Sequence, residues 1–308
     1  MIEYTTQKGQ FIKRCPCSPE VVSCGYFNVN LHTGCPYDCS YCILQTYLSS
    51  KEPVFFTNFD KLKAELEYVS KTEKYLRIGT GELSDSLAYD TETNYSKQIL
   101  DIFNKYPDII FEFKTKSANI SNLLKYGNKN NNIVVAWSLN PQSIIDAEEH
   151  YTVSLKQRLE ALKLVQDQGF MVALHFDPII FFKAWKDEYR GLIKEISKYL
   201  IPSKVAWWSI GALRFPTSLK NHIFKHKNSI LFEGELIKGY DGKYRYFKPL
   251  RTEMFLYIRQ EIEKIISKEL PLYLCMEDEE VWNEVIPKIK AEQFEINKYL
   301  YESAKKIK

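Results

Sequence analysis

Three cysteines stand close together in one short stretch and could hold a metal centre. They are Cys35, Cys39 and Cys42, with three and then two residues between them. Thiolates are soft ligands that favour iron–sulfur clusters and zinc. Three cysteines on a [4Fe-4S] cluster leave one iron without a protein ligand, and an open metal position of this kind can bind a substrate. The spacing therefore predicts a [4Fe-4S] cluster that does chemistry at one iron.

Zinc and unconnected thiols are the alternatives. Zinc sites usually combine a C-x2-C pair with a second pair of Cys or His, whereas this sequence holds no second C-x2-C. A disulfide is not expected, because nothing in the sequence marks the chain as secreted. These points favour the cluster.

The other four cysteines form a looser group. Cys15, Cys17 and Cys24 precede the cluster cysteines, and Cys275 comes late in the chain. One interpretation is a second metal site, a cluster or zinc, that uses Cys15, Cys17 and Cys24, although their spacing is no standard ligand pattern. The other is that all four are buried thiols, which behave as small hydrophobic residues.

The secondary-structure elements that must position these residues indicate an α/β fold. Strand-like runs alternate with helical ones, which is typical of parallel βα units. The strands are predicted at residues 27–33, 75–79, 109–115, 133–139, 170–176 and 204–211. The helices between them are predicted at residues 59–70, 94–105, 120–126, 153–168 and 187–199.

Polar side chains gather at the ends of these predicted strands. Functional residues of parallel barrels lie at the carboxyl ends of the strands. The polar residues at those ends are Glu82, Lys116, Ser138, Asn140, His175 and Asp177. We therefore expect them to face the same site as the cluster.

The chain changes character after the sixth strand. Residues 230–248 suggest a β-hairpin that turns at an Asp-Gly pair, Asp241-Gly242. A helix at 252–267, a short strand at 272–275 and two more helices follow. We expect three parts: an N-terminal extension (1–24), a barrel (25–212) and a C-terminal substrate-binding region (213–308).

Charge is concentrated in that last region. The whole chain has a net charge of only +3, but residues 204–251 hold ten Lys or Arg and three Asp or Glu. Tyrosines stand among these cations, a mixture that suits phosphate neutralisation and base stacking. A solvated basic surface is the alternative interpretation.

Composition and length exclude several classes of protein. The chain has 308 residues, 45% of them hydrophobic and 26% charged, which is enough for one large α/β domain or a barrel with an appendage. No apolar run approaches the ~20 residues of a membrane span, and the N-terminus lacks an apolar signal core. We therefore expect a protein of the cytoplasm, a compartment in which thiols stay reduced, and no membrane partner.

The C-x3-C-x2-C loop is the signature of radical S-adenosylmethionine (SAM) enzymes, and the chain resembles the spore photoproduct lyase family. Residues 34–46 resemble that family's cluster loop, and further matching stretches follow in the family's order. They are residues 78–85, 114–116, 137–140, 175–178, 213–215 and 239–246. The resemblance covers roughly residues 25–275. It implies an incomplete (β/α)6 radical SAM barrel with a C-terminal hairpin and helical extension.

The resemblance also implies an activity. The open iron would bind the amino and carboxylate groups of SAM and reduce it to a 5'-deoxyadenosyl radical, with electrons from an external donor such as flavodoxin or ferredoxin. Spore photoproduct lyases use that radical to repair a thymine dimer, 5-thyminyl-5,6-dihydrothymine, in DNA. A cysteine thiol then returns a hydrogen atom to the product.

This chain departs from the family at that cysteine. Glu82 stands at its place, and a carboxylic acid cannot donate a hydrogen atom as a thiol does, because its O–H bond is far stronger. Cys275 is then a candidate hydrogen donor and Tyr41 a candidate radical relay.

Further roles follow from the matched positions. Tyr41 would pack near the adenine of SAM, Gly81 and Glu82 would hold its amino group, and Lys116 its carboxylate. The other matched SAM positions are Ser84, Asp85, Ser138, Asn140, His175 and Asp177. The predicted DNA contacts are Arg214, Lys243, Tyr244, Arg245 and Tyr246, with Arg251 as a weaker one. Helix caps, core residues and ordinary hairpin pairs are the structural alternatives.

Three functions stay open on this basis. The first is a radical SAM enzyme that repairs or modifies DNA, most like a carbon–carbon lyase. The second has the same fold but acts on a modified nucleoside, RNA or a peptide. The third is a non-catalytic, cluster-bearing protein that binds nucleic acid. The oligomeric state is not set by the sequence.

Overall fold

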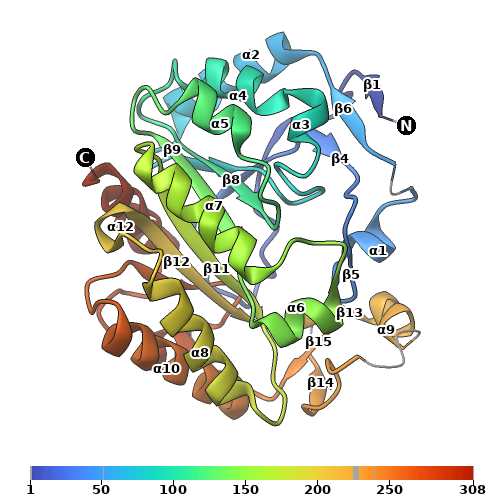
Figure 1. Ribbon diagram of the computed structural model, residues 1–308, viewed down its shortest axis with the longest axis vertical. Coiled ribbons are helices and arrows are strands. Elements are labelled where there is room, and N and C mark those ends of the chain that lie inside the picture. The colour runs from blue at the N-terminus through green and yellow to red at the C-terminus, as the bar shows by residue number, and fades with distance from the viewer. Residues whose placement is uncertain (1, 51, 225–228, 240, 308) are drawn as a thin grey trace.

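The fold is a curled sheet wrapped on its outside by helices, as Figure 1 shows for the computed structural model. The structure describes residues 2–50, 52–224, 229–239 and 241–307. In that part of the chain the main sheet has eight strands, in the order β16-β12-β11-β9-β8-β7-β3-β2. Every neighbouring pair is parallel except β2 and β3. The predicted incomplete barrel of parallel strands is therefore confirmed as a half-barrel.

Except for β2, which the sequence did not predict, the strands of this sheet overlap the predicted ones. Their bounds are β2 (Ile12–Arg14), β3 (Phe27–Val29), β7 (Arg77–Gly79), β8 (Ile110–Thr115), β9 (Ile133–Ser138), β11 (Met171–Ile179), β12 (Val205–Ala212) and β16 (Leu272–Leu274). β9 and β12 are buried along their whole length. Continuous apolar strands of this kind are typical of parallel sheets that are covered on both faces.

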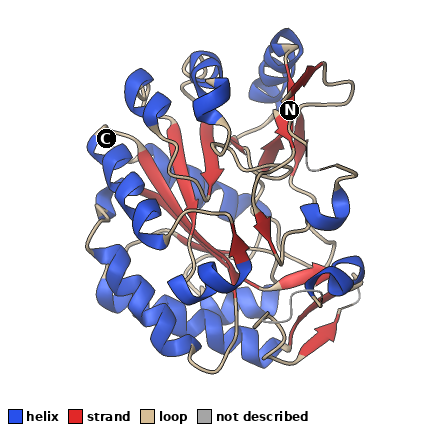
Figure 2. Ribbon diagram, turned by 45° about the vertical axis from the view of Figure 1, so that its right-hand side comes forward, coloured by secondary structure: helices blue, strands red, loops and turns tan. Residues whose placement is uncertain are grey.

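Helices cover the outer side of the sheet (Figure 2). They are α2 (Phe59–Thr72), α4 (Tyr95–Phe103), α5 (Ser121–Tyr126), α7 (Leu155–Asp167), α8 (Trp185–Ser197), α10 (Lys248–Ile265), α11 (Glu279–Val285) and α12 (Gln293–Lys305). α7 begins with a capping box between Ser154 and Gln157. Its apolar stripe, which includes Leu159 and Leu162, is buried against β9 and β11.

Smaller elements fold over the inner side of the half-barrel. β1 (Glu3–Thr5), β6 (Val54–Phe56) and β4 (His32–Thr33) form a small sheet, and β5 (Asp38–Cys39) pairs with β10 (Glu149–His150). The predicted hairpin is β14 (Leu236–Lys238) with β15 (Lys243–Tyr246), and β13 (Arg214–Pro216) joins it as a third strand. The short helices are α1 (Leu44–Tyr47), α3 (Asp90–Thr93), α6 (Gln142–Glu148), α9 (Thr217–Ile223) and the 3-10 helix η1 (Pro202–Lys204).

The predicted three-part division of the chain stays a prediction. The main sheet takes β2 from the N-terminal extension and β16 from the C-terminal region. Tyr240, which belongs to one of the matched stretches, lies outside the described residues. Among the helices that the structure does describe, none combines the length and the apolar character that crossing a membrane takes.

Candidate active site

A cavity of about 440 Å³ lies at the carboxyl ends of the parallel strands. Its volume is in the range of small-molecule sites. Most of the sequence-predicted site residues line it together. They are Cys35, Cys39, Tyr41, Cys42, Gly81, Glu82, Ser84, Asp85, Lys116, Ser138, His175, Asp177, Arg214, Lys243 and Cys275. The topology explains this gathering, because the carboxyl ends of six parallel strands lie at the cavity. These strands are β7, β8, β9, β11, β12 and β16.

The cluster loop is held in place by backbone contacts to two distant segments. Cys39 in β5 pairs with Glu149 in β10, and Ser40 N–H donates to the Glu148 carbonyl at 2.8 Å. Gly34 N–H donates to the Leu83 carbonyl at 3.1 Å. The loop is therefore fixed between the second-strand loop and the segment that follows α6.

The three thiols of the loop fit an iron–sulfur cluster. Burial raises the pKa of Cys35 to about 12, with a further contribution from the charge of Asp85. Burial also raises the pKa of Cys39, while the nearby ammonium of Lys116 lowers it. Iron would replace these protons, since cysteine binds metals as the thiolate. None of the seven cysteines, all of them within the described residues, is in a disulfide.

A single metal ion fits less well. In the part of the chain that the structure describes, no three His, Cys, Asp or Glu side chains converge closely enough to hold one ion. A [4Fe-4S] cluster needs no such convergence, because each thiolate binds a different iron. Cys15, Cys17 and Cys24 thus give no support to the predicted zinc ion.

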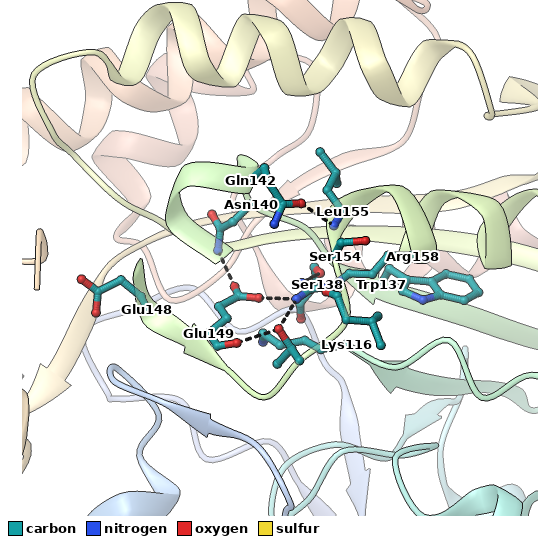
Figure 3. A network of polar contacts seen from close by, with 12 residues as sticks. Lys116, Trp137, Ser138, Asn140, Gln142, Glu148, Glu149, Ser154, Leu155 and Arg158 are labelled. Atoms are coloured by element: carbon teal, nitrogen blue, oxygen red, sulfur yellow. Dashed lines mark hydrogen bonds and ion pairs between the residues drawn. The ribbon is translucent and has the colours of Figure 1, made fainter. Parts of the chain in front are cut away.

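Glu149 lies at the centre of a network of polar contacts behind the cavity wall (Figure 3). It is 2% exposed and forms an ion pair with Arg158 at 2.7 Å. Its Oε1 also accepts hydrogen bonds from the hydroxyl of Tyr41 and, at 2.9 Å, from Asn140 Nδ2. Burial alone would raise the pKa of Glu149, but the charges of Arg158 and Lys116 outweigh it and lower this pKa to about 2. A fixed negative charge therefore stands behind two predicted SAM residues.

Lys116 and Asn140 play different parts at this wall. The ammonium of Lys116 lines the cavity and lies 5.7 Å from the centre of the Tyr41 ring. Asn140 is not among the lining residues, because its amide is used between Glu149 and the hydroxyl of Tyr189, at 2.9 Å each. Lys116 thus stays available to a ligand, whereas Asn140 links Glu149 to Tyr189 behind the cavity wall.

The second-strand loop places Gly81 and Glu82 at the opposite wall. Gly81 has a φ of +92°, and a Cβ there would lie 3.1 Å from Cβ of Lys114. Glu82 accepts a hydrogen bond from Asn30 Nδ2 at 3.0 Å. Asp85 accepts from the backbone N–H of Leu87 at 3.0 Å and of Ala88 at 2.9 Å, which is the capping alternative for this residue. It also accepts from the backbone N–H of Lys116 and the hydroxyl of Thr115, at 2.6 Å each, and so ties the loop to the end of β8.

His175 forms part of a second buried polar group. Its Nε2 lies 2.8 Å from Oε1 of Glu112, which also accepts from Trp207 at 3.0 Å and, through its other oxygen, from the hydroxyl of Tyr26. Burial lowers the pKa of His175. Burial would raise the pKa of Glu112, but His175 and the nearby Lys114 lower it to about 2.

Asp177, Arg214 and Cys275 form a third group. Nη1 of Arg214 lies 3.1 Å from Oδ1 of Asp177, and Nη2 lies 3.4 Å from Sγ of Cys275. Burial raises the pKa of Cys275, and the charge of Asp177 adds to this. The thiol therefore keeps its proton at the cavity wall.

The hairpin residues divide into surface and core. Lys243 lines the cavity, and the ring of Tyr244 stacks on Phe215 and lies 4.7 Å from the ammonium of Lys220. Arg245 forms an ion pair with Asp241.

Tyr246 and Arg251, predicted to contact DNA, are instead buried. Tyr246 is 0% exposed, and its hydroxyl accepts from the Phe181 N–H. Arg251 is 4% exposed and makes two hydrogen bonds to Glu277, at 2.9 and 3.0 Å. The polar groups of both side chains hydrogen-bond to other residues inside the protein, so both residues stabilise the fold here.

Sequence reasoning missed two residues. Glu149, which stands behind the cavity wall, lies in no matched stretch, and its pairing with Cys39 spans 110 positions of the chain. Lys114 lines the cavity, as does Cys15, which the sequence indicated only as a ligand of a second metal site. Lys114 could have been found, because it stands two residues before Lys116 on the same strand face.

The comparisons with known proteins agree with this geometry. The family model described as spore photoproduct lyase matches residues 20–278. The spore photoproduct lyase of Clostridium acetobutylicum is 28% identical over 253 residues, which are 80% of this chain and 74% of the relative. That of Bacillus subtilis is 26% identical over 171 residues, 54% of this chain and 50% of the relative.

A solved structure shows the same fold. Spore photoproduct lyase complexed with dinucleoside spore photoproduct has a TM-score of 0.76 at 22% identity, over 89% of this chain and 82% of that one. The match of the family model over most of the chain shows that the chain belongs to the spore photoproduct lyase family of radical SAM lyases.

Proposed function

We propose that this chain holds a [4Fe-4S] cluster at Cys35, Cys39 and Cys42, binds SAM beside it, and acts on a thymine lesion in DNA. One observation carries the proposal: the three thiols and all the predicted SAM residues except Asn140 line the same cavity. With both groups bound, their chemistry would supply a carbon-centred radical. The residues of the chain bind, orient and shield the reactants.

Two charges of the cavity suit the amino-acid end of SAM. Lys116 offers a point positive charge to the carboxylate, and the carboxylate of Glu82 offers an acceptor to the ammonium. Glu149 would hold Lys116 and Tyr41 in position through its charge and its hydrogen bond.

The hydrogen donor of the family is replaced by Glu82, so another group must return the hydrogen atom. Cys275 is our candidate, because its protonated thiol lines the cavity beside Arg214. Tyr41 is less suited as a relay, since its hydroxyl donates to Glu149 and its ring is 9% exposed. The hydroxyl hydrogen is thus already engaged by a carboxylate.

DNA is the proposed substrate on two grounds. The relatives are spore photoproduct lyases, and one was solved with the dinucleoside spore photoproduct. In this chain Lys243 lies at the cavity, and Lys220 and Tyr244 lie together on the adjoining hairpin surface. Cations beside an aromatic ring suit phosphate and base contacts. An external one-electron donor, such as flavodoxin or ferredoxin, and a cytoplasmic location complete the proposal.

A different substrate is the second candidate, and Glu82 is the observation that favours it. A cavity with a carboxylate where the family has a thiol would suit a reaction that needs no hydrogen donor at that position. A modified nucleoside, RNA or a peptide would then take the place of the DNA lesion.

The test is an anaerobic incubation with SAM, a reductant and DNA that carries the spore photoproduct, read by mass spectrometry. We expect thymine and 5'-deoxyadenosine together. With Cys275→Ala we expect 5'-deoxyadenosine to persist while the yield of thymine falls, and Cys24→Ala is the matched control. If 5'-deoxyadenosine forms without thymine, the second candidate holds. If neither forms and the protein still binds iron, the enzymatic proposal fails.

A further inference from the structure

Cys15 and Cys17 are joined by a tight turn at the edge of the cavity. Cys17 N–H donates to the Cys15 carbonyl at 2.9 Å, a hydrogen bond that closes a three-residue turn with Pro16 at its centre. Proline fixes φ near the value that an inverse γ-turn requires. Cys15 N–H donates to the Tyr26 carbonyl at 2.9 Å, which anchors the turn beside β3.

The turn brings the two thiols into contact. Their side chains contact each other, and this contact lowers the pKa of Cys17 and, with burial, raises that of Cys15. A thiol of lowered pKa beside a second thiol is the arrangement from which thiol–disulfide exchange begins.

The two sulfurs face different surroundings. Cys15 and Pro16 line the cavity, with Glu82 and Lys114 on the same wall, whereas Cys17 is not a lining residue. Both cysteines are half-buried and Pro16 is exposed, so a small solute can reach the turn. The next residue, Ser18, is fixed to the hairpin, because its Oγ lies 3.0 Å from Oδ2 of Asp241.

We propose that Cys15 and Cys17 are a redox-active dithiol that closes reversibly to a disulfide by exchange with a small-molecule disulfide of the glutathione class. The Cys17 thiolate attacks one sulfur of that disulfide and releases one small thiol. Cys15 then attacks the mixed disulfide, which forms the Cys15–Cys17 bond and releases the second small thiol. Two electrons pass from the protein to the small disulfide; the first small thiol leaves as its thiolate and takes a proton from water, and the proton of Cys15 leaves with the second, so the exchange balances.

The neighbouring cysteines are less suited to this role. Cys275 is engaged by Asp177 and Arg214 on the cavity wall. Cys24 lies in a segment whose carbonyl accepts from Arg77 at 2.6 Å, and seven positions separate it from Cys17. Cys15 and Cys17 are already joined by the turn. Closing the Cys15–Cys17 bond removes the Cys15 S–H from the cavity wall.

The test uses the full chain, anaerobically loaded with iron and sulfide so that the cluster cysteines are occupied. The protein is equilibrated in buffers of reduced and oxidised glutathione, trapped with N-ethylmaleimide, and cut after Lys, Arg and Glu. Residues 15–20 then form one peptide that carries Cys15 and Cys17 alone. We expect two maleimide labels in reducing buffer and, in oxidising buffer, an unlabelled peptide lighter by two hydrogens.

Variants assign the pairing. In Cys15→Ser, which keeps the attacking Cys17 but removes the resolving thiol, the peptide should carry one label in reducing buffer and one glutathione, on Cys17, in oxidising buffer. Cys24→Ser is the matched control and should leave the transition of the peptide unchanged. Two labels in every buffer, or a cross-link from this peptide to Cys24 or Cys275, would overturn the proposal. The assay does not depend on SAM or DNA, so its outcome is separate from that of the proposed function.

Discussion

The carboxylate of Glu149 joins side chains that come from three separate parts of the chain. Tyr41 follows the cluster loop, Asn140 follows β9, and Arg158 lies in α7. The guanidinium of Arg158 is 0% exposed and also donates to the Ser138 carbonyl at 2.9 Å. A single buried charge thus sets the positions of residues on both sides of the proposed SAM pocket.

Removal of that charge should be costly. Glu149→Gln keeps the size of the side chain but leaves Arg158 buried without a counter-ion, which costs about 3–5 kcal/mol of unfolding free energy. Glu160→Gln, in an exposed pair with Lys156 at 3.8 Å, is the control and should change it by less than about 1 kcal/mol. Urea unfolding of the two variants measures the difference. Equal losses of unfolding free energy in the two variants would show that the buried ion pair of Glu149 stabilises the fold no more than an exposed pair does.

The elements were predictable where the pattern is long, and less so where it is short. β8, β9, β11 and β12 are apolar runs between helical patterns, and periodicity finds them. β5 and β10 have two residues each, and their pairing joins positions that no local pattern relates. The cluster thiols and Lys116 were therefore predictable, but Glu149 was not. The burial of Tyr246 and Arg251 depends on tertiary packing, which a basic hairpin sequence does not reveal.

The loop after β7 depends on a glycine for two separable reasons. In Gly81→Ala the backbone would be strained by the positive φ of +92°, and the added Cβ would be crowded against Lys114. Gly169 has a φ of +88° with nothing within 4 Å of an added Cβ, so Gly169→Ala should cost about 1 kcal/mol from backbone strain alone. We expect Gly81→Ala to cost more and also to weaken SAM binding, as measured by calorimetry. If both variants lose the same stability and SAM affinity is unchanged, crowding at Gly81 plays no part.

β4 carries a histidine that makes the fold sensitive to acid. Burial lowers the pKa of His32 to about 4, so the unfolded chain takes up a proton at higher pH than the folded one. Stability should be complete above about pH 6.5 and fall by ~3 kcal/mol as the pH drops to about 4. Burial lowers the pKa of His175 too, which adds a loss in the same direction.

The unfolding free energy measured across this pH range checks the expectation. His32→Gln should flatten part of the slope, whereas His150→Gln, at a half-buried position, is the control. An unchanged slope in His32→Gln would contradict it.

At the scale of the whole molecule, α10 is tied to the segment after β16 by a buried and an exposed contact. Arg251 binds Glu277 in the interior, while Lys248 meets Asp278 and Glu280 at the surface, at 3.0 and 2.8 Å. Arg251→Met should cost about 3–5 kcal/mol because Glu277 stays buried and unpaired. Lys248→Met should cost less than about 1 kcal/mol. Thermal unfolding compares them, and a similar shift in both would refute the distinction.

The contact between Ser18 and Asp241 joins residues that are 223 positions apart. During translation the N-terminal wall of the cavity therefore waits for the hairpin to leave the ribosome, long after residues 35–42 have emerged. The cluster thiols are consequently uncovered for most of the synthesis of the chain. Iron and sulfide delivered in that interval would meet an open loop, whereas delivery to the finished protein would have to pass through the cavity.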